Sequence, residues 1–304
     1  MKNYGILLAL IIVCIIISIL NPKFLSGTNI VNVIRQTSLI GIIAVGLTFV
    51  ILAADIDLSI GSVAALAGVL TAGFLVNNKM SIFWAVLLPL LICAGLGLLM
   101  GVVITKARVH SFVVTLGMLS IARGLALVYT KGYSISGLDP DFRFIGGGYL
   151  WIIPMPVVIF IVLLIASYFI LAKTPYGRYI YAIGGNTEAT RLSGINVDLV
   201  RIASFGISGF LAGLGGIVLA SRVASGQPTA CVGWELDGIA AVIIGGTSLY
   251  GGRGGIFKTL IGVFFLGVIR NGLNLLEVSP FYQSIFIGVL IVAAVILDSV
   301  RKDN

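Results

Sequence analysis

The stretch QTSLIGIIAVGLTFVILAA, residues 36–54, contains no charged side chain and is long enough to cross a lipid bilayer. A bilayer core of about 30 Å requires roughly 20 predominantly apolar residues in a helix. Similar uncharged windows recur along the chain, at residues 58–78, 82–105, 151–172, 202–221 and 281–297. The chain is 59% hydrophobic and 10% charged, whereas an average soluble domain is about 25% charged. This pattern predicts an all-α polytopic membrane protein.

About ten transmembrane helices are predicted, in a single transmembrane domain that covers residues 1–304. They lie at about residues 4–20, 36–54, 58–76, 82–105, 110–129, 151–172, 200–221, 235–248, 256–275 and 281–298. The count ranges from eight to ten, because the eighth span is short and the second and third could form one broken helix. The first apolar run is expected to be a spanning helix and not a cleaved signal, because no small-residue cleavage site follows it.

Basic residues indicate how the spans are oriented. Those in connections on the side of the N-terminus are Lys2, Lys106, Arg108, Lys173, Arg178, Arg191, Arg201, Arg253, Lys258, Arg301 and Lys302. Those on the opposite side are Lys23, Lys79, Lys131, Arg143 and Arg222. Cytoplasmic loops carry an excess of Lys and Arg, so both termini are predicted to be cytoplasmic. The net charge of +8 is scattered between the spans, which makes a nucleic acid an unexpected partner.

One long connection is polar and helix-prone. Pro175 is expected to stop the preceding helix, Gly184 and Gly185 to form a sharp turn, Asn186 to cap a short helix over TEATRLS, and Gly194 to end it. The whole connection, at about residues 174–200, is longer than an ordinary link between bundled helices. It is therefore either a solvated loop or a cytoplasmic helix with a function.

Four motifs, in order along the chain, resemble the permease subunits of bacterial sugar ABC importers. They are DIDLSIGSVAALAG at 55–68, GRYIYAIGGNTEATRLSGI at 177–195, SGQPTACVGWELDGIAAVIIGGTSLYGGRGG at 225–255 and IRNGLNLLEVSPFYQ at 269–283. The resemblance is to the ribose-type importers of the branched-chain amino acid and monosaccharide permease superfamily, closest to the ribose permeases. It covers most of the chain. Departures from the family pattern are Ala54-Asp55, Gly226, Cys231 and Trp234.

The resemblance implies a function and a set of partners. The chain would be an inner-membrane permease subunit that works by alternating access with a second copy of itself. A cytoplasmic ABC ATPase would hydrolyse ATP, and a periplasmic or extracellular sugar-binding protein would deliver a monosaccharide, most closely ribose. In that family the loop helix docks into the ATPase, which implies coupling roles for Gly184, Gly185, Asn186, Glu188, Arg191, Leu192 and Gly194.

No nucleotide site or other cofactor is expected on the chain itself. GRGGIFKT, residues 252–259, has the spacing of a phosphate loop, but Phe257 stands where the glycine before the lysine is required. The only histidine, His110, has no metal-ligating neighbours in sequence, and no metal or catalytic residue is predicted. A membrane enzyme would need a catalytic cluster. An ion-coupled secondary transporter, the alternative reading, would need an ion site and usually detectable repeats.

Polar residues at membrane depth are the remaining candidates. Asp55, Asp57 and Ser59 interrupt two apolar runs. Asp57 either caps a helix at headgroup level or belongs to a discontinuous helix that lines the sugar path.

On the opposite side, Gln227, Glu235 and Asp237 are candidates for contact with the binding protein, although the two acids could instead cap the eighth span. Arg123 and Arg270 are expected to extend toward a membrane interface.

Overall fold

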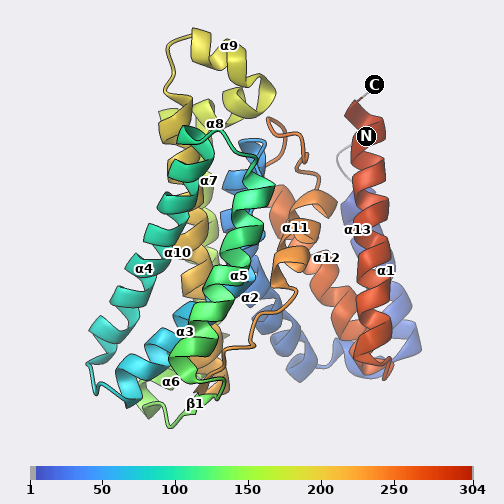
Figure 1. Cartoon of the computed structure of the whole chain (residues 1–304). Coiled ribbons are helices and arrows are strands. Elements are labelled where there is room, and N and C mark those ends of the chain that lie inside the picture. Colours follow the sequence, from blue (N-terminus) through green and yellow to red (C-terminus); the bar gives the residue numbers. More distant parts are fainter. Residues whose placement is uncertain (1–4, 303–304) are drawn as a thin grey trace.

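The computed structural model describes residues 5–302 and is almost wholly helical (Figure 1). The helices are α1 (Gly5–Leu20), η1 (Pro22–Leu25), α2 (Gly27–Leu52), α3 (Ile60–Val76), α4 (Ile82–Lys106), α5 (Ser111–Thr130), α6 (Pro140–Gly147), α7 (Met155–Lys173), α8 (Pro175–Gly185), α9 (Thr187–Leu192), α10 (Val197–Val223), α11 (Trp234–Ile244), α12 (Ile256–Leu275) and α13 (Pro280–Lys302). Two small antiparallel ribbons pair β1 (Ile135–Ser136) with β4 (Ser225–Gly226) and β2 (Tyr149–Leu150) with β3 (Ile153–Pro154).

Six of these helices, α2, α4, α5, α7, α10 and α12, are long and apolar enough to cross a membrane. Shorter apolar helices occupy Gly5–Leu20, Ile60–Val76 and Pro280–Ile296. Figure 1 shows the helices running up and down between two ends of the bundle, with α8 and α9 at one end and α6 and β1 at the other. The chain thus folds as the polytopic helical membrane protein that its hydropathy predicts.

Helix α10 is the centre of the bundle and packs on α2, α3 and α4. Its close approach depends on small residues. A Cβ atom on Gly209 would meet the backbone of Cys93, and one on Gly216 would meet the backbone of Ala64. Since lipid supplies no hydrophobic drive between helices, such close packing is a main source of their association.

The predicted short helix at the α8–α9 end is confirmed. Helix α9 begins after Asn186, whose side-chain oxygen accepts a hydrogen bond from the amide of Ala189 at 2.9 Å. Gly194 follows it with φ +81°, a left-handed conformation that glycine adopts at little cost.

The expectation that Gly184 and Gly185 form the sharp turn before α9 is wrong. Both lie in the last turn of α8, and the chain turns at the extended Asn186. Gly184 serves close packing instead, because a Cβ atom there would strike the carbonyl oxygen of Leu52 and the amide of Gly252.

Two non-helical stretches interrupt the bundle. Residues 53–59 separate α2 from α3, so these are two helices joined by a break. Residues 227–233 lead into α11, which has 11 residues and ends at Ile244. The predicted eighth span at 235–248 is therefore too short to cross a bilayer as a helix, since 11 residues rise only about 16 Å.

Candidate functional sites

The break between α2 and α3 is built around Asp57, which is fully buried. One carboxylate oxygen accepts hydrogen bonds from the amide and the hydroxyl of Ser59, at 2.9 and 2.6 Å. The other accepts from the hydroxyl of Ser208 on α10, at 2.8 Å. Asp57 thus holds Ser59, the N-cap residue of α3, and ties the start of this helix to α10. Non-helical backbone at membrane depth persists only where such partners satisfy it.

Helix α5 satisfies the backbone of the same break. The amide of Ile56 donates to the hydroxyl of Ser111 at 3.2 Å, and the hydroxyl of Thr115 donates to the carbonyl of Ile56 at 3.3 Å. Asp57 and Ser59 are both 0% exposed. The sequence suggested that these residues could line a sugar path. In this conformation neither side chain is exposed on such a path.

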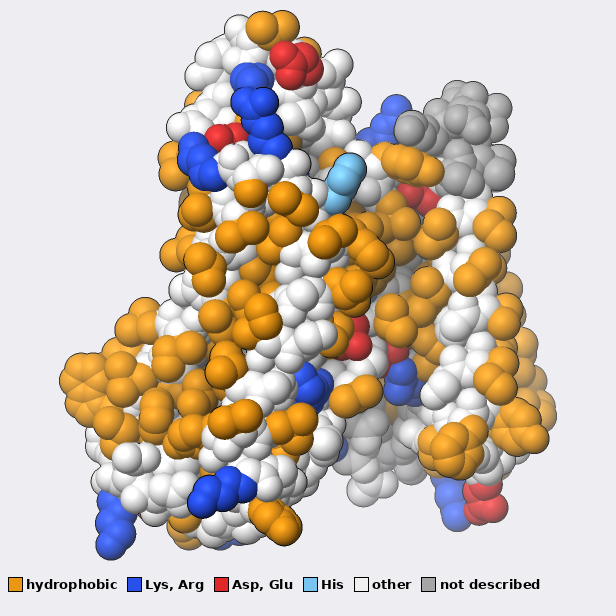
Figure 2. All heavy atoms as spheres, viewed as in Figure 1, with side chains coloured by type: hydrophobic (Ala, Val, Ile, Leu, Met, Phe, Trp, Pro, Cys, Tyr) orange, Lys and Arg blue, Asp and Glu red, His pale blue; other side chains and the backbone are white. Residues whose placement is uncertain are grey.

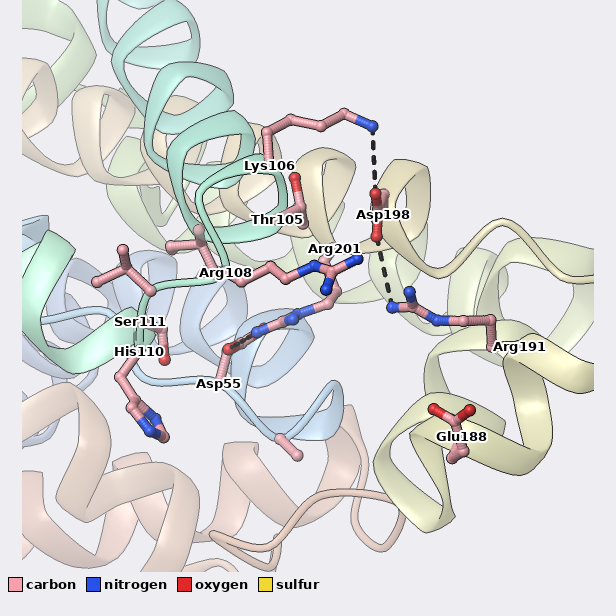
Figure 3. A pocket seen from close by; sticks show the side chains of 13 residues that line it. Asp55, Thr105, Lys106, Arg108, His110, Ser111, Glu188, Arg191, Asp198 and Arg201 are labelled. Atoms are coloured by element: carbon pink, nitrogen blue, oxygen red, sulfur yellow. Dashed lines mark hydrogen bonds and ion pairs between the residues drawn. The ribbon is translucent and has the colours of Figure 1, made fainter.

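Asp55 lies at the edge of the break and reaches a cavity. It is 3% exposed and pairs with Arg201 of α10 through two hydrogen bonds, Nε to Oδ2 at 2.7 Å and Nη2 to Oδ1 at 2.5 Å. Figure 3 shows this pair beside the cavity, into which Arg108 and Arg201 both extend. The cavity has a volume of about 780 Å³ and includes residues from α4, α5, α9 and α10 in its lining.

The same cavity connects the break to helix α9. Asp198 of α10 forms ion pairs with Arg191 of α9 at 3.7 Å and with Lys106 of α4 at 3.2 Å (Figure 3). Asp198 and Arg201 are three residues apart on α10 and so lie on neighbouring parts of one helix face. A displacement of α9 can therefore reach Asp55 through two ion pairs and one turn of α10.

Helix α9 presents an exposed surface next to this cavity. Thr190 is buried, whereas Glu188 and Arg191 are exposed and Leu192 is 81% exposed. Leu199, at the start of α10, is 63% exposed. Leu192 and Leu199 are thus large apolar side chains that the rest of the chain leaves uncovered at this end of the bundle.

Helix α8 anchors α9 to the bundle. The Tyr176 hydroxyl lies 3.0 Å from the hydroxyl of Ser204 on α10, and burial raises the pKa of Tyr176 to about 12. The hydroxyl is therefore protonated at any physiological pH and remains a hydrogen-bond donor. Together with the close packing of Gly184, this contact makes the base of α9 rigid.

The three residues expected to face a binding protein occupy different places. Gln227 is exposed, Glu235 is half-buried and Asp237 is 4% exposed. Asp237 forms an ion pair with Arg270 of α12. Its expected role in external contact is therefore wrong. It lies inside the bundle, because α11 begins part-way across it and not at its surface.

Several residues of these sites were not found from the sequence. Ser208 and Thr115 look like ordinary small polar residues in apolar helices, and only the fold brings them to the break. Arg123 and Arg270 were expected to reach an interface, but each has a partner within the protein. A charged residue well inside an apolar run is the one signal that could have marked these two arginines.

Residues 29–295 match the model of a protein family described as branched-chain amino acid transport system / permease component. The chain belongs to this permease family. It is 47% identical to the ribose import permease protein RbsC of Haemophilus influenzae, over 96% of this chain and 91% of that protein. It is also 47% identical to RbsC of Bacillus subtilis, over 98% and 93%.

The D-allose transport system permease protein AlsC of Escherichia coli is a more distant relative, 38% identical over 97% of this chain and 91% of that protein. No solved structure matches the chain. The family membership and the apolar helices together make this protein a multi-pass transport permease of the inner membrane and not an enzyme.

Proposed function

We propose that this chain is the transmembrane subunit of an ABC importer that moves ribose or a related monosaccharide into the cell. Identity of 47% over nearly the full length to two ribose import permeases supports the substrate class. The ion-coupled alternative is not favoured, because the relatives are components of import systems and the exposed α9 needs a partner.

In this proposal the α8–α9 end is cytoplasmic, and α9 is the coupling helix. About ten crossings result if α1, α3 and α13 span together with the six long helices, and if residues 227–233 and α11 cross as one discontinuous segment. Both termini then lie on the cytoplasmic side, as the distribution of basic residues indicates. The whole chain acts as one transmembrane domain.

The proposed machine contains two copies of this chain, two ATPase subunits and one sugar-binding protein outside. ATP binds to the ATPase, and the chain itself hydrolyses none. The α9 surface with Glu188, Arg191 and Leu192 fits a cleft of the ATPase. Asn186 and Gly194 define the start and the end of this helix, and Gly184 and Gly185 form the last turn of α8 before it. Gln227 and the helix ends on the outer side of the membrane are then available to contact the binding protein.

The observation that carries the coupling role is the rigid seat of an exposed helix above the Asp55–Arg201 pair. Arg191→Glu reverses a charge on that surface and breaks the ion pair with Asp198. Gly194→Val places a branched residue at φ +81° and distorts the end of α9. Each variant should still insert and bind the binding protein but should lose ATPase association or sugar-stimulated ATP hydrolysis.

The test is a pull-down of the ATPase by each purified variant, followed by hydrolysis in vesicles with loaded binding protein. Lys131→Gln, on an exposed residue at the opposite end of the bundle, is the matched control. If both variants retain wild-type association and stimulation, α9 is an ordinary solvated connection. If the wild-type complex accumulates no pentose at all, the substrate assignment is wrong instead.

A further inference from the structure

Four charged side chains lie part-way along three helices of the bundle. They are Arg123 on α5, Glu235 and Asp237 on α11, and Arg270 on α12. Arg123 is 12 residues from the first residue of α5 and Arg270 is 14 from the first residue of α12, so they lie about 18 and 21 Å along their helices. Figure 2 shows basic and acidic side chains meeting at mid-height in a hollow between α5 and α13, with hydrophobic side chains around them.

Part of this cluster has a structural role. One guanidinium nitrogen of Arg123 donates to the carbonyls of Pro228 and Ala230, at 2.5 and 2.8 Å. These carbonyls belong to the series of turns before α11 and would otherwise lack partners at membrane depth. Arg270 likewise compensates the charge of Asp237.

That role leaves hydrogen-bonding capacity unused. Within residues 5–302, the other N–H groups of Arg123 have no hydrogen bond, and Glu235 uses one carboxylate oxygen, which accepts from the amide of Gly233 at 3.2 Å. Arg123 and Glu235 are both half-buried and close enough to interact electrostatically. Among the described residues, the Nε of Arg270 is also buried without a hydrogen-bond partner. A structural scaffold alone would not need these free donors and acceptors.

The charges of the cluster also limit what it can bind. Two arginines and two acids sum to zero, so an ion of either sign would gain little there. A sugar hydroxyl both donates and accepts, and so can bridge a free carboxylate oxygen and a free guanidinium N–H. Charged groups at this depth are costly and almost always face the bundle interior or a water-filled space.

We propose that Arg123 and Glu235 form a transient hydrogen-bonding site for the hydroxyl groups of the sugar part-way along its path. The site rests on the proposed function. It lies at the start of α11, next to Gly61 of α3, where a Cβ atom would strike the Glu235 carboxylate. The carbonyl oxygen of Cys231 lies against Gly61 as well, so the start of α3 and the stretch before α11 meet at the site, and a movement of α3 changes its shape.

The experiment compares the uptake of ribose with that of its monodeoxy analogues by the complete transporter in vesicles. The same binding protein is used throughout at saturating sugar, so that its own selectivity cancels between permease variants. Glu235→Gln keeps the size of the side chain but removes its charge. It should shrink the preference for ribose over at least one analogue about fivefold, the equivalent of one hydrogen bond of about 1 kcal/mol.

Arg123→Lys should change the same preference, and Lys131→Gln should not. A purely structural role would lower the uptake of all sugars by one common factor and leave every preference unchanged, which would overturn the site. Failure of the wild-type complex to transport any pentose would overturn the proposed function instead. If Arg123→Lys fails to accumulate in the membrane, Glu235→Gln still tests the site. The Glu235 carboxylate accepts only one hydrogen bond, from the amide of Gly233, so its replacement should not prevent folding.

Discussion

The ion pair between Asp55 and Arg201 gives a prediction whose size follows from the structure. Arg201→Ala leaves the carboxylate of Asp55 with 3% exposure and without its two charge-assisted hydrogen bonds. Removing one partner of a wholly buried pair costs about 3–5 kcal/mol. Arg201→Ala should therefore destabilise the protein by about 3–4 kcal/mol.

Asp55→Ala should cost less than Arg201→Ala. The side chain of Arg201 is 23% exposed and faces the cavity, so water can hydrate the unpaired guanidinium. Two charge-assisted hydrogen bonds of about 1.5–3 kcal/mol each, partly replaced by water, leave a loss of about 2–3 kcal/mol. The double variant should cost little more than Arg201→Ala alone, which corresponds to a coupling energy of about 2 kcal/mol.

The measurement is reversible unfolding of the purified permease in mixed detergent micelles, followed by the fluorescence of its three tryptophans. Lys106→Ala is the control, because the Lys106–Asp198 pair has a lysine that is 68% exposed and should contribute less than about 1 kcal/mol. Strictly additive losses in the double variant, or a smaller loss for Arg201→Ala than for Asp55→Ala, would refute the reasoning.

Three further predictions concern other parts of the molecule. Asp57→Ala should lower the folding stability by about 2–4 kcal/mol and should reduce transport, because it leaves the buried Ser59 and Ser208 without their partner. Asp57→Asn should recover part of the stability in the same unfolding assay. Equal stability of the two variants would contradict the role of Asp57 at the start of α3. Gly184→Val should prevent α8 from packing against Leu52 and Gly252, and so should lower ATPase-coupled uptake. Gly185→Val should not lower it, because a Cβ atom there meets nothing within 4 Å. Equal uptake by the two variants would contradict the close-packing argument. The purified chain without its ATPase subunit should bind no labelled ATP in a filter assay, and stoichiometric binding would contradict the division of labour.

The sequence was sufficient to predict the six long apolar helices and the short helix α9, because both depend on local chemistry. An uncharged run of spanning length can be read directly, and so can Asn186 before a helix and Gly194 after it. The glycine pair before α9 was misread, because the same residues serve turns and close packing. Only the neighbouring backbone of Leu52 and Gly252 decides between the two uses.

The depth of a polar residue was harder to predict than its presence. Glu235 and Asp237 follow a polar stretch, and a helix that starts there is naturally placed at the membrane surface. The structure instead carries residues 227–233 into the bundle, where Arg123 supplies hydrogen bonds that neighbouring residues in the sequence cannot. Hydropathy indicates which segments can lie in a lipid bilayer. Long-range contacts determine where a non-helical segment is stable inside the bundle.

Helix α5 provides those long-range contacts to both discontinuous stretches. Its first turns, through Ser111 and Thr115, hydrogen-bond the break beneath Asp55, and Arg123 further along holds the stretch before α11. A tilt of α5 must therefore alter both stretches together, since neither can lose these bonds without exposing backbone at membrane depth. The cavity beside α9 includes Ser111 in its lining. Movement at the proposed ATPase contact would thus reach the proposed sugar site through a single helix, and such a path needs no flexible hinge between the two.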